Sequence, residues 1–126
     1  MGMRTPLKNV RHLGSAKEGT VHWWHQKVTA VALIPLFVIA LAYVVALVGA
    51  DYDRVRYILS LPFTTIILLL LIGTTFYHLK LGLQVVIEDY IHTEMTKMVL
   101  LLLNSFFCAV VGLAAALAAL KLAFGG

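Results

Sequence analysis

The sequence predicts an all-α integral membrane protein with three transmembrane helices, and its composition and its uncharged runs lead to that fold class. Of the 126 residues, 61% are hydrophobic and 13% are charged, and the mean hydropathy is +0.92. A soluble domain is roughly 45–50% apolar and about 25% charged. This chain therefore has too little polar surface for a soluble domain and too much apolar surface for a disordered one.

Three stretches without Asp, Glu, Lys or Arg, residues 28–50, 57–79 and 98–120, are each 23 residues long. About 20 apolar residues in a helix cross the hydrocarbon core of a bilayer, which is about 30 Å thick. A spanning segment must satisfy its backbone hydrogen bonds internally, so each stretch is predicted to be a helix. At this length the chain is one membrane-anchor domain, residues 1–126, without room for a separate catalytic domain.

The segment before the first span, residues 1–27, is polar and basic, and it sets the predicted orientation. The side of the membrane with this segment and the second loop carries seven Lys and Arg, and the other side carries three. Positively charged loops stay in the cytoplasm. We therefore expect a cytoplasmic N-terminus and a periplasmic C-terminus. The basic residues of the segment are Arg4, Lys8, Arg11, Lys17 and Lys27.

The spans are expected at about 28–50, 57–87 and 98–122. Pro35 lies inside the first span, where a proline can kink a helix. The second span is extended beyond Lys80 because apolar residues continue to Ile87. The third ends in small residues, 112–119, which favour either close helix packing or a lipid-facing surface. Cys108 is the only cysteine, which excludes an internal disulfide or CxxC pair, and it is expected to pack as a small hydrophobic residue.

The segment from His78 to His92 carries the most informative chemistry. His78 is embedded in an apolar span, where ionisable side chains are costly and mark candidate functional sites. A neutral imidazole is a good iron ligand, but an imidazole that bonds a neighbouring helix is equally compatible with the sequence. Gly82 lies on the same helix face, where it leaves room for a flat macrocycle or another helix.

Asp89 and Tyr90 follow at the end of the same span. Asp89 is about 20° from His78 around the helix and about 16 Å further along it. A phenol beside a carboxylate suits a quinone, because the phenol can donate a hydrogen bond to a quinone carbonyl. The alternative is that Tyr90 is an interfacial anchor of the kind common in membrane proteins.

Tryptophans and a lysine precede the first span in the sequence HWWHQK, residues 22–27. Paired tryptophans at this position are typical interface anchors. Lys27 is either a topology determinant or a cation that pairs with haem propionates. The residue pattern assigns no role to Lys80 or to the remaining histidines, His12, His22, His25 and His92.

The pattern H-x3-G-x-Q-x4-D-Y, formed by His78, Gly82, Gln84, Asp89 and Tyr90, resembles the smaller of the two hydrophobic membrane anchors of succinate dehydrogenase, respiratory complex II. The segment GTVHWWHQKVTA, residues 19–30, resembles the region before the first span in the same family. Lysine at residue 27 departs from the arginine usual there, and it cannot form arginine's bidentate contact.

The resemblance implies a three-helix subunit that pairs with the larger membrane anchor and holds the flavoprotein and iron–sulfur subunits on the lipid bilayer. It implies haem b between the two anchors with His78 as an axial ligand, and a ubiquinone contact at Tyr90 with Asp89 beside it. It places Lys27 near the haem propionates. FAD and iron–sulfur clusters would lie in partner subunits, so the chain would be non-catalytic alone.

Two other functions fit the sequence less well. A quinol:fumarate reductase anchor has the same architecture with reversed electron flow. A small transporter or assembly protein would need a coupling charge deep in the membrane, and no such charge or repeat is seen. The basic balance is explained by topology, so no nucleic acid is expected. The expected location is a bacterial inner membrane rather than the mitochondrial inner membrane, since residues 1–27 do not resemble a transit peptide.

Overall fold

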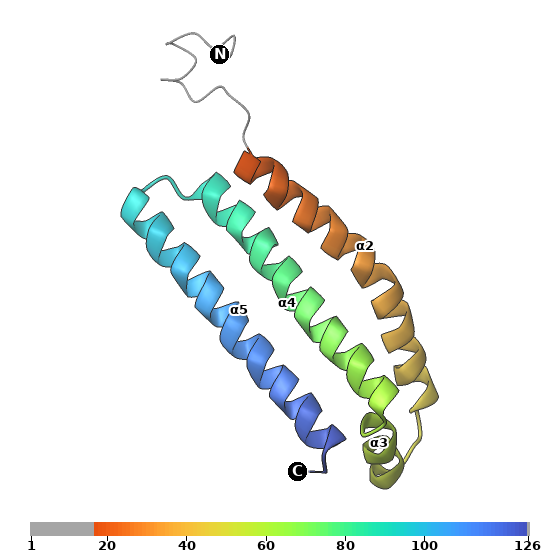
Figure 1. Ribbon diagram of the computed structural model, residues 1–126. Coiled ribbons are helices and arrows are strands. Elements are labelled where there is room, and N and C mark those ends of the chain that lie inside the picture. The colour runs from red at the N-terminus through yellow and green to blue at the C-terminus, as the bar shows by residue number, and fades with distance from the viewer. Residues whose placement is uncertain (1–16, 126) are drawn as a thin grey trace, which may run out of the picture.

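The computed structural model describes residues 17–125, with side chains from residue 20 onward, and this part is helical (Figure 1). The helices are α2 (Lys17–Ala46), α3 (Tyr52–Leu59), α4 (Pro62–Tyr90) and α5 (Glu94–Ala123). Three of them, over Thr20–Ala46, Pro62–Tyr90 and Glu94–Ala123, are long and apolar enough to cross a membrane. The prediction of three spanning helices is thus confirmed. Arg4, Lys8, Arg11 and His12 lie outside the described residues, as does the side chain of Lys17.

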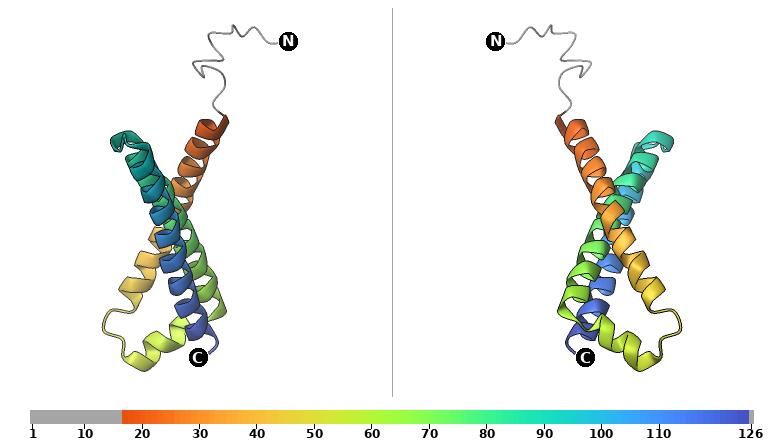
Figure 2. Two further views of the ribbon diagram at one scale, coloured as in Figure 1. Left: turned by 90° about the vertical axis from the view of Figure 1, so that its left-hand side faces the viewer. Right: turned by 90° about the vertical axis from the view of Figure 1, so that its right-hand side faces the viewer.

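The middle helix, α4, packs against both α2 and α5, while α2 and α5 do not contact each other within residues 17–125. The three long helices form one layer rather than a closed bundle, and α2 crosses the other two obliquely (Figures 1 and 2). The start of α2, the end of α4 and the start of α5 lie at one end of the molecule. Lys27 and Tyr90 are therefore on the same side of the layer's midplane, as the sequence predicts.

The first loop differs from the prediction, because it contains the short helix α3. Asp51 caps this helix, and its carboxylate accepts a hydrogen bond from the Arg54 backbone N–H at 2.9 Å. Tyr57 belongs to α3, so the second long helix begins at Pro62 instead of residue 57. Proline is favoured at the first turn of a helix because its missing N–H would have no partner there.

The ends of the long helices also differ from the predicted limits of the spans. The first long helix begins at Lys17, before residue 28, and it ends at Ala46, before a turn with Gly49 at a φ of 80°. The other long helices run to Tyr90 and from Glu94. The helix remains continuous across Pro35, and Figure 1 shows α2 as a bowed helix.

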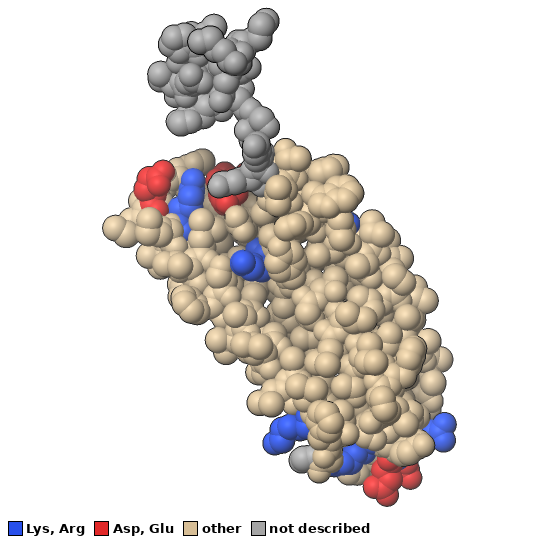
Figure 3. Space-filling view, viewed as in Figure 1, with Lys and Arg blue, Asp and Glu red and all other residues tan. Residues whose placement is uncertain are grey.

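Few side chains are buried, because a single layer of helices leaves most of its apolar side chains on its two faces. Figure 3 shows charged side chains near the two ends and a broad uncharged band between them. The buried residues are Leu33, Thr64, Thr65, Ile67, Leu81, Asn104, Cys108 and Ala119. Cys108 is 4% exposed, which confirms its predicted packing role. Within the small-residue run, Gly112 lies against the Phe76 side chain of α4, so this position serves close packing.

Candidate functional site

One group of polar contacts between α2 and α4 centres on His78. The Nδ1 atom of His78 lies 2.9 Å from the Thr29 hydroxyl on α2. That hydroxyl is also 2.8 Å from the His25 backbone carbonyl and 3.0 Å from that of Gln26. The imidazole is therefore held between α2 and α4, within the length of both candidate spans.

The other ring nitrogen of His78, Nε2, has no hydrogen-bond partner within residues 17–125. The side chain is half-buried. In the described part of the chain, two polar side-chain atoms are both enclosed and without a partner, His22 Nε2 and Gln26 Oε1. His78 Nε2 is not one of them, so this nitrogen is accessible at the surface of the chain. The structure thus gives one ring nitrogen a partner and leaves the other without one in the described residues.

A second contact between the same helices lies beside the first. The hydroxyl of Tyr77 lies 3.0 Å from Nδ1 of His25, and the two rings are tilted with centroids 6.0 Å apart. The sequence predicts no role for His25, and the structure gives it a packing partner. The pairs His25–Tyr77 and Thr29–His78 are neighbours in space, since His25 and Thr29 are one turn apart on α2 and Tyr77 and His78 are adjacent on α4.

Gly82 faces α2, as its helical position predicts. A Cβ atom there would lie 3.5 Å from Nε2 of Gln26. Of the two alternatives for this glycine, a macrocycle or another helix, the helix occupies the space in this chain. The buried and unpartnered atoms of Gln26 and His22 lie on the same face of α2 as this contact, which makes this part of the interface unusually polar.

Asp89 and Tyr90 end helix α4 and are both exposed, with the Tyr90 side chain 76% accessible. Gln84 Nε2 donates to Glu88 Oε1 at 3.1 Å one turn earlier. The structure does not bring Asp89 or Tyr90 into contact with His78. They instead form a polar end to the helix that carries it.

Lys27 is exposed on α2, and its Nζ lies 5.8 Å from the centroid of the Trp23 ring. A cation over an indole face is attracted by the ring quadrupole.

Lys80 contributes to the contact between α4 and α5 through its backbone. Its carbonyl accepts a hydrogen bond from Asn104 Nδ2 on α5 at 3.0 Å. His92 is exposed beyond the end of α4.

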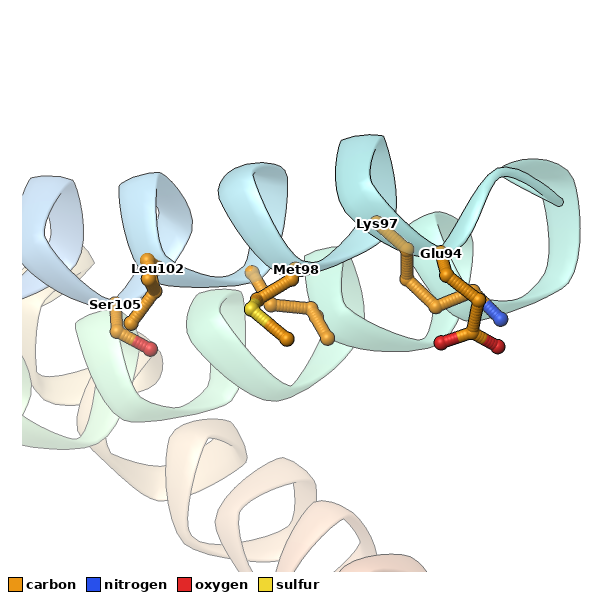
Figure 4. A pocket seen from close by; sticks show the side chains of 6 residues that line it. Glu94, Lys97, Met98, Leu102 and Ser105 are labelled. Atoms are coloured by element: carbon orange, nitrogen blue, oxygen red, sulfur yellow. The ribbon is translucent and has the colours of Figure 1, made fainter.

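A hollow of about 330 Å³ lies along the start of α5. Glu94 and Lys97 extend in the same direction at its outer end, and Met98, Leu102 and Ser105 follow inward (Figure 4). None of the predicted site residues lines it. Within residues 17–125, no three His, Cys, Asp or Glu side chains lie close enough together to hold a metal ion.

The family model described as succinate dehydrogenase/fumarate reductase transmembrane subunit matches residues 1–117. The chain belongs to this family. The family resemblance inferred from the His78–Tyr90 pattern is thereby confirmed. The match covers all of α2, α3 and α4 and most of α5.

The sequences of individual family members align with this chain over most of their length. The chain is 34% identical over 104 residues to the succinate dehydrogenase hydrophobic membrane anchor subunit of Rickettsia bellii, covering 82% of this chain and 83% of the relative. It is 31% identical over 110 residues to that of Paracoccus denitrificans, covering 87% and 85%. It is 32% identical over 91 residues to the succinate dehydrogenase membrane anchor subunit of Reclinomonas americana, covering 70% and 76%. No solved structure gives a significant match.

Family membership identifies a multi-pass membrane subunit that is not catalytic by itself. Sequence reasoning found His78, Gly82 and the end of α4. It missed Thr29 and Tyr77 as partners of the histidines. Thr29 is part of the segment before the first span that resembles the family, but only the fold shows which side chain it meets.

Proposed function

We propose that this chain is the membrane anchor subunit of a succinate:quinone oxidoreductase and that His78 supplies one axial ligand to haem b. We further propose that Tyr90, with Asp89 beside it, forms part of the ubiquinone site. The observation that carries the haem assignment is the half-buried His78 imidazole in an apolar span, with Nδ1 bonded to Thr29 and Nε2 unpartnered.

The anchoring role follows from the family and the form of the chain. The relatives are named as hydrophobic membrane anchor subunits of succinate dehydrogenase. Residues 17–125 are taken up by the three long helices and the short helix α3, and succinate chemistry is therefore assigned to partner subunits. The flavoprotein and iron–sulfur subunits would bind at the end of the layer where α2 begins and α4 ends, which is the cytoplasmic end in the predicted orientation.

The residues present fit haem b. A neutral imidazole with one nitrogen held by the protein is the usual form of a histidine ligand. Among the histidines of residues 20–125, His78 is the one that is half-buried and has a side-chain partner on Nδ1, so bis-histidine ligation would use a second histidine from the larger membrane anchor. When bound, haem b supplies a one-electron carrier within the membrane. The contribution of this chain is to hold the ligand in a fixed orientation within the spans.

Lys27 is the proposed partner of a haem propionate. In the free chain its amine lies near the Trp23 ring and is exposed, so it is available to an anionic group. An ammonium group binds such an anion as a point charge.

The exposed phenol of Tyr90 fits a hydrogen-bond donor for a quinone carbonyl at the membrane boundary. Asp89 adds a carboxylate that can orient this donor or exchange protons. The pocket itself requires partner surfaces, because both side chains lie at the open end of α4. Ubiquinone would therefore be held between this chain and its partners.

The haem assignment is tested on the complex purified through a tag on this chain. A reduced-minus-oxidised spectrum should show a low-spin b-type signal, and partner subunits should copurify. His78→Ala should lose haem or change its spin state. His92→Ala, at an exposed position outside the span, is the matched control and should leave the spectrum unchanged. An unaltered low-spin spectrum in His78→Ala would refute the ligand assignment.

The quinone assignment is tested with Tyr90→Phe, which removes the phenol hydroxyl with little change of volume. A single hydrogen bond contributes about 1 kcal/mol, so succinate:quinone reductase activity should fall roughly fivefold at low quinone concentration. Succinate oxidation with an artificial acceptor should not change. Normal quinone activity would leave Tyr90 as an interfacial anchor.

The family description also covers fumarate reductase anchors. The relatives reported above are all named for succinate dehydrogenase, which favours succinate oxidation. Comparing the two directions in the purified complex separates them, since a quinol:fumarate reductase would reduce fumarate with quinol faster than it oxidises succinate.

A further inference from the structure

The Thr29 hydroxyl has more polar neighbours than it has hydrogens. Its oxygen lies 2.8 Å from the His25 carbonyl, 3.0 Å from the Gln26 carbonyl and 2.9 Å from His78 Nδ1. A hydroxyl provides one donor and two acceptor positions. The hydrogen must therefore be assigned to one side, and this assignment determines the state of the imidazole.

The two carbonyl contacts decide the direction. A carbonyl oxygen can only accept, so an approach of 2.8 Å between two oxygens is favourable only if the hydroxyl donates. Donation by a threonine to the carbonyl one turn earlier is a common arrangement within helices. If the hydroxyl instead donated to His78, two oxygen–oxygen contacts would lack a hydrogen. The Thr29 oxygen therefore accepts the hydrogen bond from His78.

We propose that Thr29 is a positioning residue for His78: its hydroxyl accepts the Nδ1–H of the imidazole and thereby holds the ring in the tautomer whose Nε2 lone pair is free for iron. This inference rests on the proposed haem-ligand function of His78. It concerns a residue of α2 that does not touch the iron and acts only through the ligand.

The geometry gives Thr29 two effects on the ligand. It fixes the rotation of the ring, because the bond joins α4 to a hydroxyl that is itself tied to the α2 backbone. It also increases the electron density on Nε2, since a hydrogen bond accepted from Nδ1–H raises the basicity of a histidine ligand. A more basic ligand stabilises the ferric state more than the ferrous state, which lowers the midpoint potential of the haem.

The test uses the complete purified complex with Thr29→Val, which keeps the shape of the side chain but has no hydroxyl, and Thr29→Ser, which keeps the hydroxyl. Losing the partner of a ligand histidine typically weakens metal binding about 10- to 100-fold. A tenfold loss confined to the ferric state corresponds to about 59 mV in a one-electron potential. We expect Thr29→Val to raise the midpoint potential in this range and to release haem faster, with Thr29→Ser close to the parent protein.

Tyr77→Phe is the matched control. It removes the neighbouring hydrogen bond between α2 and α4, at His25, without touching His78. In the Tyr77→Phe complex, the midpoint potential of the haem and its low-spin ferric electron paramagnetic resonance spectrum should not change. Thr29→Val should shift both. Equal shifts in Tyr77→Phe and Thr29→Val, or in Thr29→Ser and Thr29→Val, would show a packing effect and overturn the proposal.

Three further outcomes are decisive. Thr29→Ala is measured beside Thr29→Val in case the valine complex does not assemble. If neither assembles while His78→Ala does, the hydroxyl acts on folding and the proposal is wrong. If the parent complex contains haem that His78→Ala loses, but Thr29→Val keeps the parent potential, the positioning role fails and the ligand assignment stands. A parent complex without haem would refute the ligand assignment and with it this inference.

Discussion

Replacing Asn104 by Leu should loosen the contact between α4 and α5. Asn104 is 7% exposed, and its Nδ2 donates to the Lys80 carbonyl across the interface at 3.0 Å. Its Oδ1 also accepts a weak bond from Cys108 Sγ at 3.6 Å. Leucine has a similar volume and makes neither bond, so the change removes the hydrogen bond to α4 together with the weak bond to Cys108 within α5.

The expected magnitude is small because the Lys80 carbonyl still accepts its helical hydrogen bond after the substitution. Hydrogen bonds between helices in membranes contribute about 0.6 kcal/mol on average and about 1.7 kcal/mol at most. These values correspond to a roughly threefold to 18-fold increase in the population of the opened interface. We expect the lower end of this range.

Cys108 provides the assay. It is the single cysteine of the chain, it is 4% exposed, and it lies on the face of α5 that meets α4. When opening and closing are fast, the labelling rate of a buried group follows the open population. The rate of maleimide labelling of this chain, measured by mass spectrometry in the purified complex, should therefore rise about threefold in Asn104→Leu.

Tyr43→Phe is the control for this measurement. Thr64 donates to the Tyr43 hydroxyl at 3.0 Å between α2 and α4, so the control breaks a bond of the same kind at the other interface. Its labelling rate should match that of the parent protein. A parent-like rate in Asn104→Leu would refute the reasoning, and an equal rise in both variants would show that labelling reports opening of the whole layer.

Two further predictions concern packing and capping. In Gly112→Leu the new side chain meets Phe76, whose Cβ and Cγ lie 3.4 Å from the position of a Cβ. Overpacking costs about 1–3 kcal/mol, so the melting temperature of the complex should fall, with Gly112→Ala as the milder comparison; an unchanged value in both would contradict the close contact. Asp51→Ala removes the cap of α3, which is worth about 1 kcal/mol. Amide exchange of residues 52–59 should become about fivefold faster, with Asp53→Ala as the control, and equal protection would contradict the capping role.

The three long helices could be predicted from the sequence because the bilayer imposes both their length and their lack of charge. The short helix α3 is not predicted, because its residues Asp53, Arg54 and Arg56 are typical of a charged loop. Its signal is Asp51 three residues before Arg54, which is the spacing of a helix cap. Tyr57 is apolar enough to extend the second span, and the sequence therefore assigns it to the wrong helix.

The candidate site also has a part that the sequence predicts and a part that it does not. His78, Gly82 and Tyr90 share one helix, so their relative positions follow from helical periodicity. The partner of His78 is Thr29, which lies 49 residues earlier in the chain. Periodicity within each helix does not determine how far one helix is shifted along another, and this shift brings the two side chains together.

The order of the helices in the layer has a consequence for biosynthesis. Each long helix contacts the long helix that follows it in the chain, while the first and last do not meet within the described residues. As the chain leaves the ribosome, α4 can dock on α2 and α5 can then dock on α4, without any helix having to enter between two that have already joined. Contacts between neighbours in the sequence also require little loop closure, which favours rapid assembly. The newly made chain can therefore complete its own fold in the order of its synthesis.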